Sequence, residues 1–503
     1  MDSAYKKLVK LFTRQYRLTH MGAMIGWDEA VMMPAGGGEA RGKAMAELAL
    51  ISHELFANDD SIADLLAAAS EAADPSDQWH VASIKTMKRQ WQQTVCLPAD
   101  LVEAKSLAST KCEQAWRHMR GENDWKNFKP IFTEVVNLTR KEAEIRSGVN
   151  GTSKYNALLD LYEPGQKSEN IDIVFAQLKA FLPQLIQEIA EKQKTATCIQ
   201  PVGPFTSESQ KALGLKIMAQ IGFDFDHGRL DVSHHPFCGG VPEDVRITTR
   251  YSEDDFVESI MGVIHESGHA SYEQGLPAAY RELPVGCANG LGMHESQSLI
   301  FEMQICRSPE FISFLTPWII EHFGQQGDAK INKAALTPDN IQAIYLQVKP
   351  DFIRVNADEV TYPCHVILRY EIEKALIEGA IEVADIPELW NEKMETYLRL
   401  STKGNYKDGC MQDVHWPSGA LGYFPTYTLG AMNAAQLFAA MQKALPQVKA
   451  DIKAGDFSAL RQWLKENVWS QASLHSIEDL MAQATGEPLN GKYFETHLRQ
   501  RYL

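Results

Sequence analysis

The stretch Val263-Ile264-His265-Glu266-Ser267-Gly268-His269-Ala270 contains the pattern H-E-x-x-H. Residues four apart lie on the same face of a helix, so His265 and His269 can offer imidazole nitrogens to one metal ion. Glu266 directly follows the first histidine, and its carboxylate can therefore approach a metal-activated water molecule as a general base. Apolar residues at helical spacing precede the motif, and Gly275 with Pro277 follows it. The stretch predicts a zinc-peptidase helix over about residues 255–274.

A catalytic zinc site commonly has three protein ligands and one open position. The segment after His269, as far as Gly275, contains no histidine that could be the third ligand. A second pattern, Leu291-Gly-Met-His-Glu-Ser-Gln-Ser298, offers Glu295 instead. Glu295 is separated from His269 by the end of the first helix and a loop rich in glycine and proline, a spacing that suits a second, roughly antiparallel helix. Glu295 is therefore the predicted third ligand.

Composition limits the classes of partner. The 503 residues are 45% hydrophobic and 23% charged, which is typical of a soluble globular protein. The 49 Lys and Arg residues against 65 Asp and Glu residues give a net charge of −16, which repels nucleic acid and anionic membranes. We therefore expect no nucleic-acid partner and no membrane partner.

Three further features concern the compartment. Residues 1–16 are amphipathic and rich in lysine, unlike a secretory signal. The segment Pro417–Gln442 has no charged residue, but its polar residues, prolines and glycines interrupt it, which favours a buried or site-lining segment over a membrane span. The eight cysteines show no CxxC spacing. Free thiols in a reducing cytoplasm fit this pattern best.

Helical spacing covers most of the chain, whereas the β-branched alternation of Val241–Tyr251 predicts a strand just before the motif helix. The sequence thus predicts a mainly α fold with a small sheet beside the zinc helix. The simplest organisation is one large domain over residues 1–503, and a division into two lobes stays open. The predicted helices cover residues 3–20, 39–55, 60–72, 77–95, 99–121, 125–147, 171–194, 207–222, 255–274, 289–306, 309–323, 338–347, 363–379, 387–400, 428–443, 456–467, 476–484 and 490–501.

The two metal-ligand motifs together resemble the carboxypeptidase Taq family of metallocarboxypeptidases. Further stretches match the family pattern in the same order over nearly the whole chain, and no motif position departs from it. These stretches are Gly26-Trp27-Asp28 through Met33-Pro34, His235-Pro-Phe237, Asp244-Val-Arg-Ile-Thr248, Ile353-Arg-Val-Asn-Ala-Asp358, Gly409-Cys-Met-Gln-Asp-Val-His-Trp416 and Gly422-Tyr-Phe-Pro-Thr-Tyr-Thr-Leu-Gly430.

The resemblance implies a helical fold like that of neurolysin and angiotensin-converting enzyme, with a deep groove between two lobes. It also implies a homodimer that releases single residues from the free C-termini of peptides with broad side-chain tolerance. By this matching, His265, His269 and Glu295 hold Zn²⁺ and Glu266 is the base. The same ligands would also hold Co²⁺ or Mn²⁺. Spacing alone does not predict the carboxypeptidase specificity.

The resemblance also favours catalytic roles for two residues near the uncharged segment. A tetrahedral oxyanion needs hydrogen-bond donors beyond the metal, and His415 and Tyr423 are the candidates. On the residues alone, the more ordinary interpretation is a hydrogen-bonded core histidine and a packing tyrosine.

A carboxypeptidase must also recognise a terminal carboxylate, for which arginine has the best-shaped donors. Arg354 is the first candidate, with an ion pair to Asp358 as its structural alternative. Arg246 is the second candidate, and an internal pair with Asp244 is its alternative. His235 is expected to form a wall at the closed end of the groove.

Carboxylates commonly orient ligand histidines through the second ring nitrogen. Asp358, Glu359 and Asp413 are the candidates for this role, and the sequence does not rank them. His294, next to Glu295, is expected to form hydrogen bonds rather than to contact the metal.

Two other functions remain open at this point. The same zinc chemistry on the same scaffold would serve an oligopeptidase, which cleaves inside peptides. A helical binding scaffold with an inert site is the alternative from another class.

Overall fold

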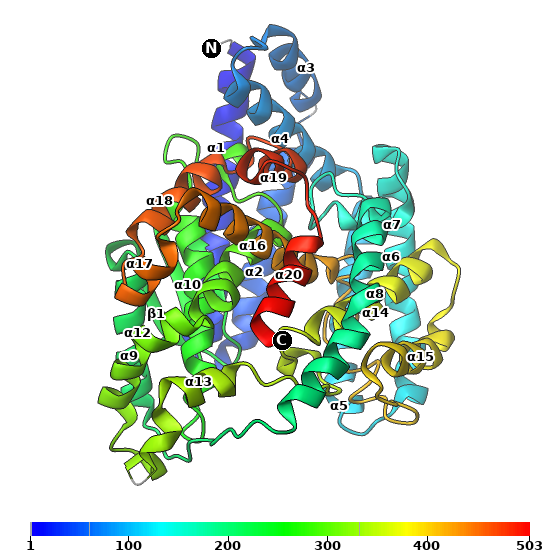
Figure 1. Cartoon of the computed structure of the whole chain (residues 1–503). Helices are drawn as coiled ribbons and strands as arrows, with labels where there is room; N and C mark the ends of the chain where they lie inside the picture. The colour runs from blue at the N-terminus through cyan, green and yellow to red at the C-terminus, as the bar shows by residue number, and fades with distance from the viewer. Residues whose placement is uncertain (1–2, 60, 331) are drawn as a thin grey trace.

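A computed structural model describes residues 3–59, 61–330 and 332–503 (Figure 1). Helices form most of the chain, and the one sheet of the described part has three strands. This confirms the predicted fold class. The helices are α1 Ser3–Val31, α2 Gly38–Ala57, α3 Ile62–Ala72, α4 Gln78–Val95, α5 Ala99–Met119, α6 Trp125–Asn150, α7 Lys154–Leu159, α8 Ser168–Gln193, α9 Ser207–Ile221, α10 Val257–Gly275, α11 Leu291–Leu299, α12 Pro309–Phe323, α13 Pro338–Tyr345, α14 Tyr362–Glu378, α15 Ile386–Leu398, α16 Pro425–Ala444, α17 Val448–Ala454, α18 Ser458–Asn467, α19 Ile477–Thr485 and α20 Lys492–Tyr502. The strands are β1 Gly228–Val232, β2 Cys238–Val241 and β3 Asp244–Thr249.

Local sequence explains many helix ends. The side chains of Asp124 and Ser308, for example, accept hydrogen bonds from backbone N–H groups in the first turns of α6 and α12. At the other end, Gly222 adopts φ = 89° after α9, a conformation that glycine reaches without steric cost. These caps satisfy backbone groups that the helix itself leaves unpaired.

The helix predictions differ from the structure in several places. Helix α1 continues to Val31, beyond the predicted residue 20, because its apolar run keeps helical spacing. Helices α7 and α17 have only six and seven residues and gave no clear periodic signal. The predicted helix over 60–72 begins at Ile62 in the structure, and residue 60 lies outside the described residues.

The predicted strand over 241–251 was wrong in extent. Pro242 and Glu243 form a turn that divides it into β2 and β3, and β1 was not predicted. The strand order is β1-β3-β2, with β1 parallel and β2 antiparallel to β3. Buried Leu230, Val245 and Ile247 form a small core with α10, through residues such as Val263. The sheet therefore supports the helix that carries the H-E-x-x-H motif.

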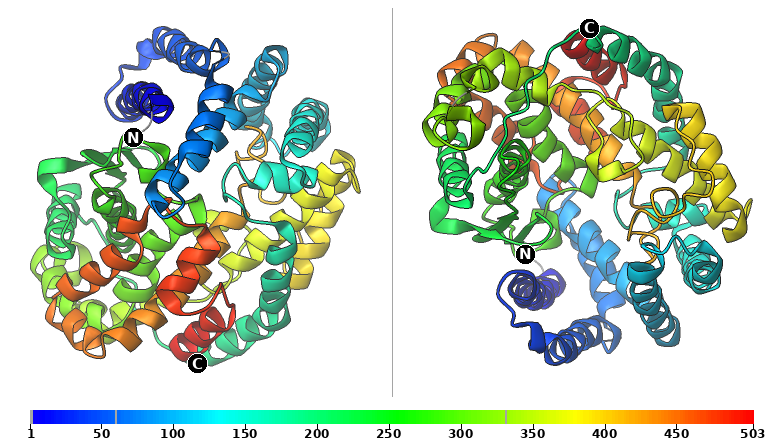
Figure 2. Two further views of the ribbon diagram at one scale, coloured as in Figure 1. Left: turned by 90° about the horizontal axis from the view of Figure 1, so that it is seen from above. Right: turned by 90° about the horizontal axis from the view of Figure 1, so that it is seen from below.

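Two large apolar cores lie on either side of α16. One core contains residues of α5, α6, α8, α14 and α15, and the other contains residues of α9, α10, α12 and α18. The ribbon views show these two groups of helices with α16 between them (Figures 1 and 2). Leu429 and Met432 of α16 belong to the first core, whereas Leu437 and Met441 belong to the second. Helix α16 is therefore shared by both halves.

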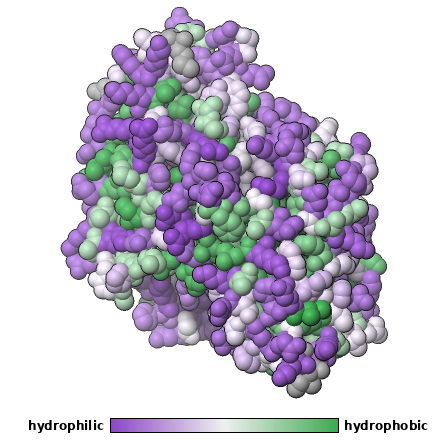
Figure 3. Space-filling view, turned by 90° about the vertical axis from the view of Figure 1, so that its left-hand side faces the viewer, coloured by the Kyte–Doolittle hydropathy of each residue, from purple (hydrophilic) through white to green (hydrophobic). Residues whose placement is uncertain are grey.

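A smaller core joins α1, α3 and α4 to the loop at Val285. Hydrophilic residues cover much of the face shown in Figure 3, with apolar residues in scattered groups. The uncharged segment Pro417–Gln442 contributes most of α16 and is largely buried, as predicted. In the described part of the chain, no helix combines the length and the apolar character that crossing a membrane requires.

Candidate metal centre

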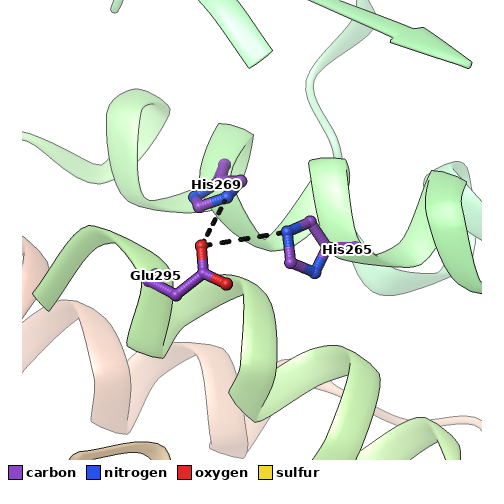
Figure 4. Close-up of side chains that lie close together, drawn as sticks. All are labelled: His265, His269 and Glu295. Carbon is purple, nitrogen blue, oxygen red and sulfur yellow. Dashed lines mark ion pairs between the residues drawn. The ribbon is translucent and has the colours of Figure 1, made fainter. Parts of the chain in front are cut away.

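Helices α10 and α11 bring His265, His269 and Glu295 together (Figure 4). Nε2 of His269 lies 3.5 Å from Oε2 of Glu295, and Nε2 of His265 lies 4.0 Å from the same oxygen. One ligand atom from each residue lies within 4.8 Å of the other two. Two imidazoles and one carboxylate converging in this way match the donor set of a catalytic zinc site.

Two glycines allow α11 to approach its neighbours at backbone distance. A Cβ atom at Gly268 of α10 would lie 2.5 Å from the carbonyl oxygen of Gln297. A Cβ atom at Gly430 of α16 would lie 2.6 Å from Cγ of Glu295. Any larger residue at either position would displace α11 or the Glu295 side chain. The position of the third donor thus depends on close helix packing from two sides.

A carboxylate orients His265 through its second ring nitrogen. Nδ1 of His265 lies 2.8 Å from Oε2 of Glu302, and Arg307 donates to the other carboxylate oxygen at 2.5 Å. Glu302 lies in a π-helical segment, Ile300–Cys306, that continues α11. Such segments occur frequently at functional sites. With Nδ1 occupied by Glu302, Nε2 of His265 is the nitrogen that faces the donor cluster.

His269 is held differently. Nδ1 of His269 lies 3.1 Å from the carbonyl oxygen of His294 and 2.6 Å from the Nδ1 atom of His294. The other ring nitrogen of His294 lies 2.8 Å from Oε1 of Glu273. His294 therefore forms hydrogen bonds, as predicted, and leaves Nε2 of His269 directed at Glu295.

Burial and neighbouring charges shift the titration of these groups. Burial raises the pKa of Glu266 to about 7 and lowers the pKa of His269 to about 4. Burial also acts to lower the pKa of His265, but the hydrogen bond to Glu302 and the charges of Glu295 and Glu302 outweigh it and raise the pKa to about 10. In the metal-free protein, a proton on His265 therefore offsets part of the surrounding negative charge.

The charge balance of this cluster also fits a cation. Glu266, Glu295 and Glu302 are three buried or nearly buried carboxyl groups, whereas Arg307 and a protonated His265 are the two cationic side chains that pair with them. Unpaired buried carboxylates are costly. A divalent cation among His265, His269 and Glu295 would supply the missing positive charge, so the residues fit the metal that the motif predicts.

The cluster opens onto a cavity of about 670 Å³. His265, Glu266 and Glu295 line it, together with Tyr362 and Tyr427. The candidate base therefore faces a space that can hold part of a substrate. Glu302 and Tyr362 were missed by the sequence analysis, because no local motif links them to the ligands. Tyr427 was also missed as a site residue, although it lies one helical turn from Tyr423 in the stretch Gly422–Gly430 that matches the family pattern.

The two predicted donors, His415 and Tyr423, lie in an aromatic cluster. Nε2 of His415 lies 3.3 Å from the hydroxyl of Tyr427, and the ring of His415 lies 5.2 Å from that of Tyr423. Burial lowers the pKa of His415 to about 4, so this ring is neutral at neutral pH. The Nδ1 atom of His415 is buried without a hydrogen-bond partner in the described part of the chain.

The two candidate arginines have different surroundings. Arg354 is 4% exposed and donates to Oδ1 of Asp413 through Nε (3.1 Å) and Nη2 (2.8 Å). Arg369, which is fully buried, donates to the other oxygen of Asp413 at 2.7 Å. Arg246 instead forms a two-point pair with Asp244 at 2.9 and 2.8 Å, the structural alternative named for it.

The predicted carboxylate partners of the ligand histidines were wrong. Asp358 accepts hydrogen bonds from Thr361 and neighbouring backbone groups, and it does not pair with Arg354. Glu359 pairs with His497 of α20 at 2.6 Å. Asp413 holds two arginines instead. Each of these three carboxylates pairs with residues other than His265 and His269. Glu302 is the carboxylate that orients a ligand histidine, His265.

His235 lies in the loop between β1 and β2. Its side chain is exposed, and its carbonyl oxygen accepts a hydrogen bond from Ser233 at 2.5 Å. The structure therefore does not bring His235 into the cluster formed by His265, His269 and Glu295, and its role as a wall stays a prediction.

Comparisons with known proteins agree over the full length. The family model described as carboxypeptidase Taq (M32) metallopeptidase matches residues 7–502. The chain is 34% identical to thermostable carboxypeptidase 1 of Thermus thermophilus, covering 100% of this chain and 98% of that protein. It is 33% identical to carboxypeptidase 1 of Bacillus subtilis, covering 99% and 97%.

The solved structure of metallocarboxypeptidase 1 of Trypanosoma cruzi is similar with a TM-score of 0.96 at 44% identity, covering 99% of both chains. A structure of the Pyrococcus furiosus carboxypeptidase is similar with a TM-score of 0.94 at 30% identity, covering 100% of this chain and 99% of that chain. These similarities confirm the resemblance seen in the motifs and the helical fold that it implied.

Gly430→Ala tests the helix packing around Glu295. The added methyl group would overlap Glu295, so we expect weaker metal binding and a free energy of unfolding lower by about 1–3 kcal/mol. Gly42→Ala on α2 is the matched control, because no atom lies within 4 Å of the added Cβ there. Metal titration and denaturant unfolding measure both effects. Unchanged metal affinity in Gly430→Ala would contradict this account of the packing.

Glu302→Gln tests the orientation of His265. A neutral amide cannot hold the imidazole as the carboxylate does, so we expect metal affinity to fall by about 10–100-fold. Equilibrium competition with a chromophoric chelator measures the affinity. Glu321→Gln, an exposed carboxylate paired with Lys216, serves as the control. Equal affinities for both variants would assign Glu302 a purely structural role.

Proposed function

The chain belongs to the carboxypeptidase Taq (M32) family of metallopeptidases, and from this premise we propose how its residues hydrolyse peptides. The protein is a metallocarboxypeptidase, a peptide hydrolase that depends on a divalent metal. The roles of individual residues, the identity of the metal and the oligomeric state are the proposed parts.

His265, His269 and Glu295 hold the metal in this proposal, and the metal is zinc. The nitrogen and oxygen donors suit zinc, and the ring nitrogens are directed by Glu302 and the His294 carbonyl group. When bound, such an ion lowers the pKa of a water molecule and polarises a carbonyl oxygen. Co²⁺ and Mn²⁺ accept the same donors and would replace zinc.

Glu266 acts as the general base and then as the acid. Its carboxylate accepts a proton from the attacking water molecule and delivers it to the amine that leaves when the peptide bond breaks. Its place beside His265 on α10, and its exposure to the same cavity as Glu295, support this role. The convergence of the three donors, two of which line the same cavity as Glu266, is the observation that carries the proposal.

His415 and Tyr423 are the proposed donors to the oxyanion, and Tyr427 joins them. Tyr427 lines the cavity with Glu295, and its hydroxyl lies 3.3 Å from Nε2 of His415. A neutral imidazole and a phenol each offer one polar hydrogen for this purpose. Their aromatic neighbours keep the donors fixed before substrate arrives.

Arg354 is the proposed site for the terminal carboxylate. Arg354 and Arg369 share the single carboxylate of Asp413, which leaves one positive charge unbalanced in a buried cluster. A buried unpaired charge is costly, and the carboxylate of a substrate would balance it. Arg246 is less suited, because Asp244 already balances its charge and the ring of Trp27 lies 4.4 Å away.

Three finer parts of the proposal rest mainly on the family. His235 forms the wall that limits how far a peptide extends beyond the cleaved bond. The protein is a homodimer. It works in the cytoplasm, and the eight cysteines, all free in the structure, support a reducing compartment.

Glu266→Gln tests the proposed chemistry. General acid–base catalysis is worth about 10²–10⁴-fold, so we expect kcat to fall by that order while bound metal stays at the parent level. The assay uses an N-blocked peptide with a free C-terminus, and elemental analysis gives the metal content. Glu321→Gln, whose side chain is 61% exposed and does not line the cavity, is the control.

The C-amidated form of the same peptide separates the carboxypeptidase from an oligopeptidase. The parent enzyme should leave the amide intact, because Arg354 would lose its charged partner. Internal cleavage of the amidated peptide would favour the oligopeptidase. Unchanged turnover by Glu266→Gln would favour an inert scaffold with hydrolysis due to a contaminant.

Arg354→Ala tests carboxylate recognition. A hydrogen bond to a charged group contributes about 1.5–3 kcal/mol, so kcat/KM should fall by roughly 10–100-fold, mainly through KM. Asp413 keeps Arg369 as its partner, so the fold should persist, and circular dichroism checks this. Arg246→Ala is the comparison. A loss in Arg246→Ala without one in Arg354→Ala would move the role to Arg246.

A further inference from the structure

The last helix of the chain, α20, contacts the segment that carries Glu302. Arg501 of α20 donates a hydrogen bond from Nη1 to the carbonyl oxygen of Met303, and another from Nη2 to the carbonyl oxygen of Gln304 at 3.0 Å. The Arg501 side chain is only 11% exposed. Both acceptors directly follow Glu302 in the π-helical segment Ile300–Cys306. A helix far along the chain thus contacts the backbone beside the carboxylate that orients His265.

The two carbonyl groups lie at the end of a helix, where such groups lack partners. The last four carbonyl groups of a helix have no donor within the helix itself, and this segment ends at Cys306. Met303 and Gln304 provide two of these four groups. A positive charge at this end also interacts favourably with the helix dipole. Arg501 therefore caps the helix that begins as α11, and its planar guanidinium reaches two oxygens at once.

A buried carboxylate keeps Arg501 in this place. Oε2 of Glu359 lies 3.5 Å from Nη1 of Arg501 and accepts a hydrogen bond from the hydroxyl of Tyr502 at 2.9 Å. Oε1 of Glu359 lies 2.6 Å from Nε2 of His497. Glu359 is 4% exposed. Three side chains of α20 thus converge on one carboxylate, which fixes the guanidinium against the end of the π-helical segment.

We propose that Arg501 is a positioning residue for the metal centre, which caps the helix end beside Glu302 and so keeps the Glu302 carboxylate against Nδ1 of His265. That carboxylate lies 2.8 Å from the ring nitrogen, and groups behind a ligand histidine act by fixing the orientation of its ring. The inference rests on the proposed role of His265 as a metal ligand. The plainer interpretation is that Arg501 only attaches α20 to the fold, and metal affinity would then be independent of it.

The test measures the Zn²⁺ affinity of the full-length Arg501→Ala protein by equilibrium competition with a chromophoric chelator. We expect the affinity to fall about tenfold, the lower end of the effect seen for groups that support a metal ligand. Arg499→Ala is the matched control on the same helix, because Arg499 is 40% exposed and pairs with Glu495 and Glu188. Arg499→Ala should keep the parent affinity. Equal affinities of the two variants would overturn the proposal.

A double-mutant cycle tests whether Arg501 acts through Glu302. If it does, adding Arg501→Ala to Glu302→Gln should lower the Zn²⁺ affinity by less than about twofold further, because the two changes remove the same interaction. A further loss as large as that in Arg501→Ala alone would show that the two residues act independently and would overturn the proposed route.

Chemical rescue separates capping from folding. Arg501 lines a cavity of about 770 Å³, so a free guanidinium ion can reach the space that Arg501→Ala leaves. Millimolar guanidinium chloride should restore the Zn²⁺ affinity of Arg501→Ala and leave that of Arg499→Ala unchanged. A loss of affinity that guanidinium does not restore would assign the loss to displacement of α20 and contradict the cap.

Stability is measured beside affinity in every variant. Thermal unfolding followed by circular dichroism shows whether each protein is folded, and lower stability with parent affinity would overturn the proposal. If Arg501→Ala does not fold, Arg501→Lys replaces it, because lysine keeps the charge but lacks the two-point fork, and its affinity should lie below that of Arg499→Lys. Equal affinities of these two lysine variants would overturn the proposal. Absence of Zn²⁺ binding by the parent protein would instead contradict the proposed function.

Discussion

The close approach of α10, α11 and α16 brings the three candidate metal ligands together. Gly268 lies against the backbone of α11 from one side, and Gly430 lies against the Glu295 side chain from the other. A Cβ added at Gly268 would lie 2.5 Å from a backbone atom of α11, and one added at Gly430 would lie 2.6 Å from the Glu295 side chain. Both distances are too short for atoms that are not bonded to each other. Core packing has little room to absorb such a shift. Glu295 lies beside His265 and His269 because Gly268 and Gly430 leave room for α11 between α10 and α16.

Two buried clusters have unbalanced charge of opposite sign, and Tyr362, which lines the cavity, also hydrogen-bonds to Arg354 of the second cluster. Around His265 and Glu295, carboxylates exceed cations, and a divalent ion would restore the balance. Around Asp413, two arginines share one carboxylate, and an anionic ligand group would restore it. Charge that the fold leaves unpaired costs stability unless a ligand completes it. The two imbalances match a substrate whose carbonyl group approaches a cation while its terminal carboxylate approaches an arginine.

Spacing along the sequence predicted the candidate metal ligands, which lie close together in the chain. The partners of other site residues depend on tertiary contacts, which spacing does not predict. His265 and His269 follow from the helical period, and Glu295 needed only a short loop and a second helix. The structural alternative for Arg354 was an ion pair four residues away, with Asp358, yet Arg354 pairs with Asp413, 59 residues further along the chain. Asp358 instead accepts hydrogen bonds from its own turn. The sequence does not show whether its carboxylate will bond to the nearby backbone or to an arginine. Glu302 was missed because no pattern marks the carboxylate that will face an imidazole.

The uncharged segment Pro417–Gln442 shows why composition alone misleads. A lack of charge is also typical of membrane-spanning helices, but the small and polar residues of this segment have distinct roles among the packed helices. Gly430 admits the Glu295 side chain, and Tyr427 lines the groove. Leu437 joins one apolar core, while Leu429 joins the other. Between Leu429 and Phe438 every residue of α16 except Ala431 is buried, which accounts for the absence of charge there, and the exposed end of the helix carries Lys443.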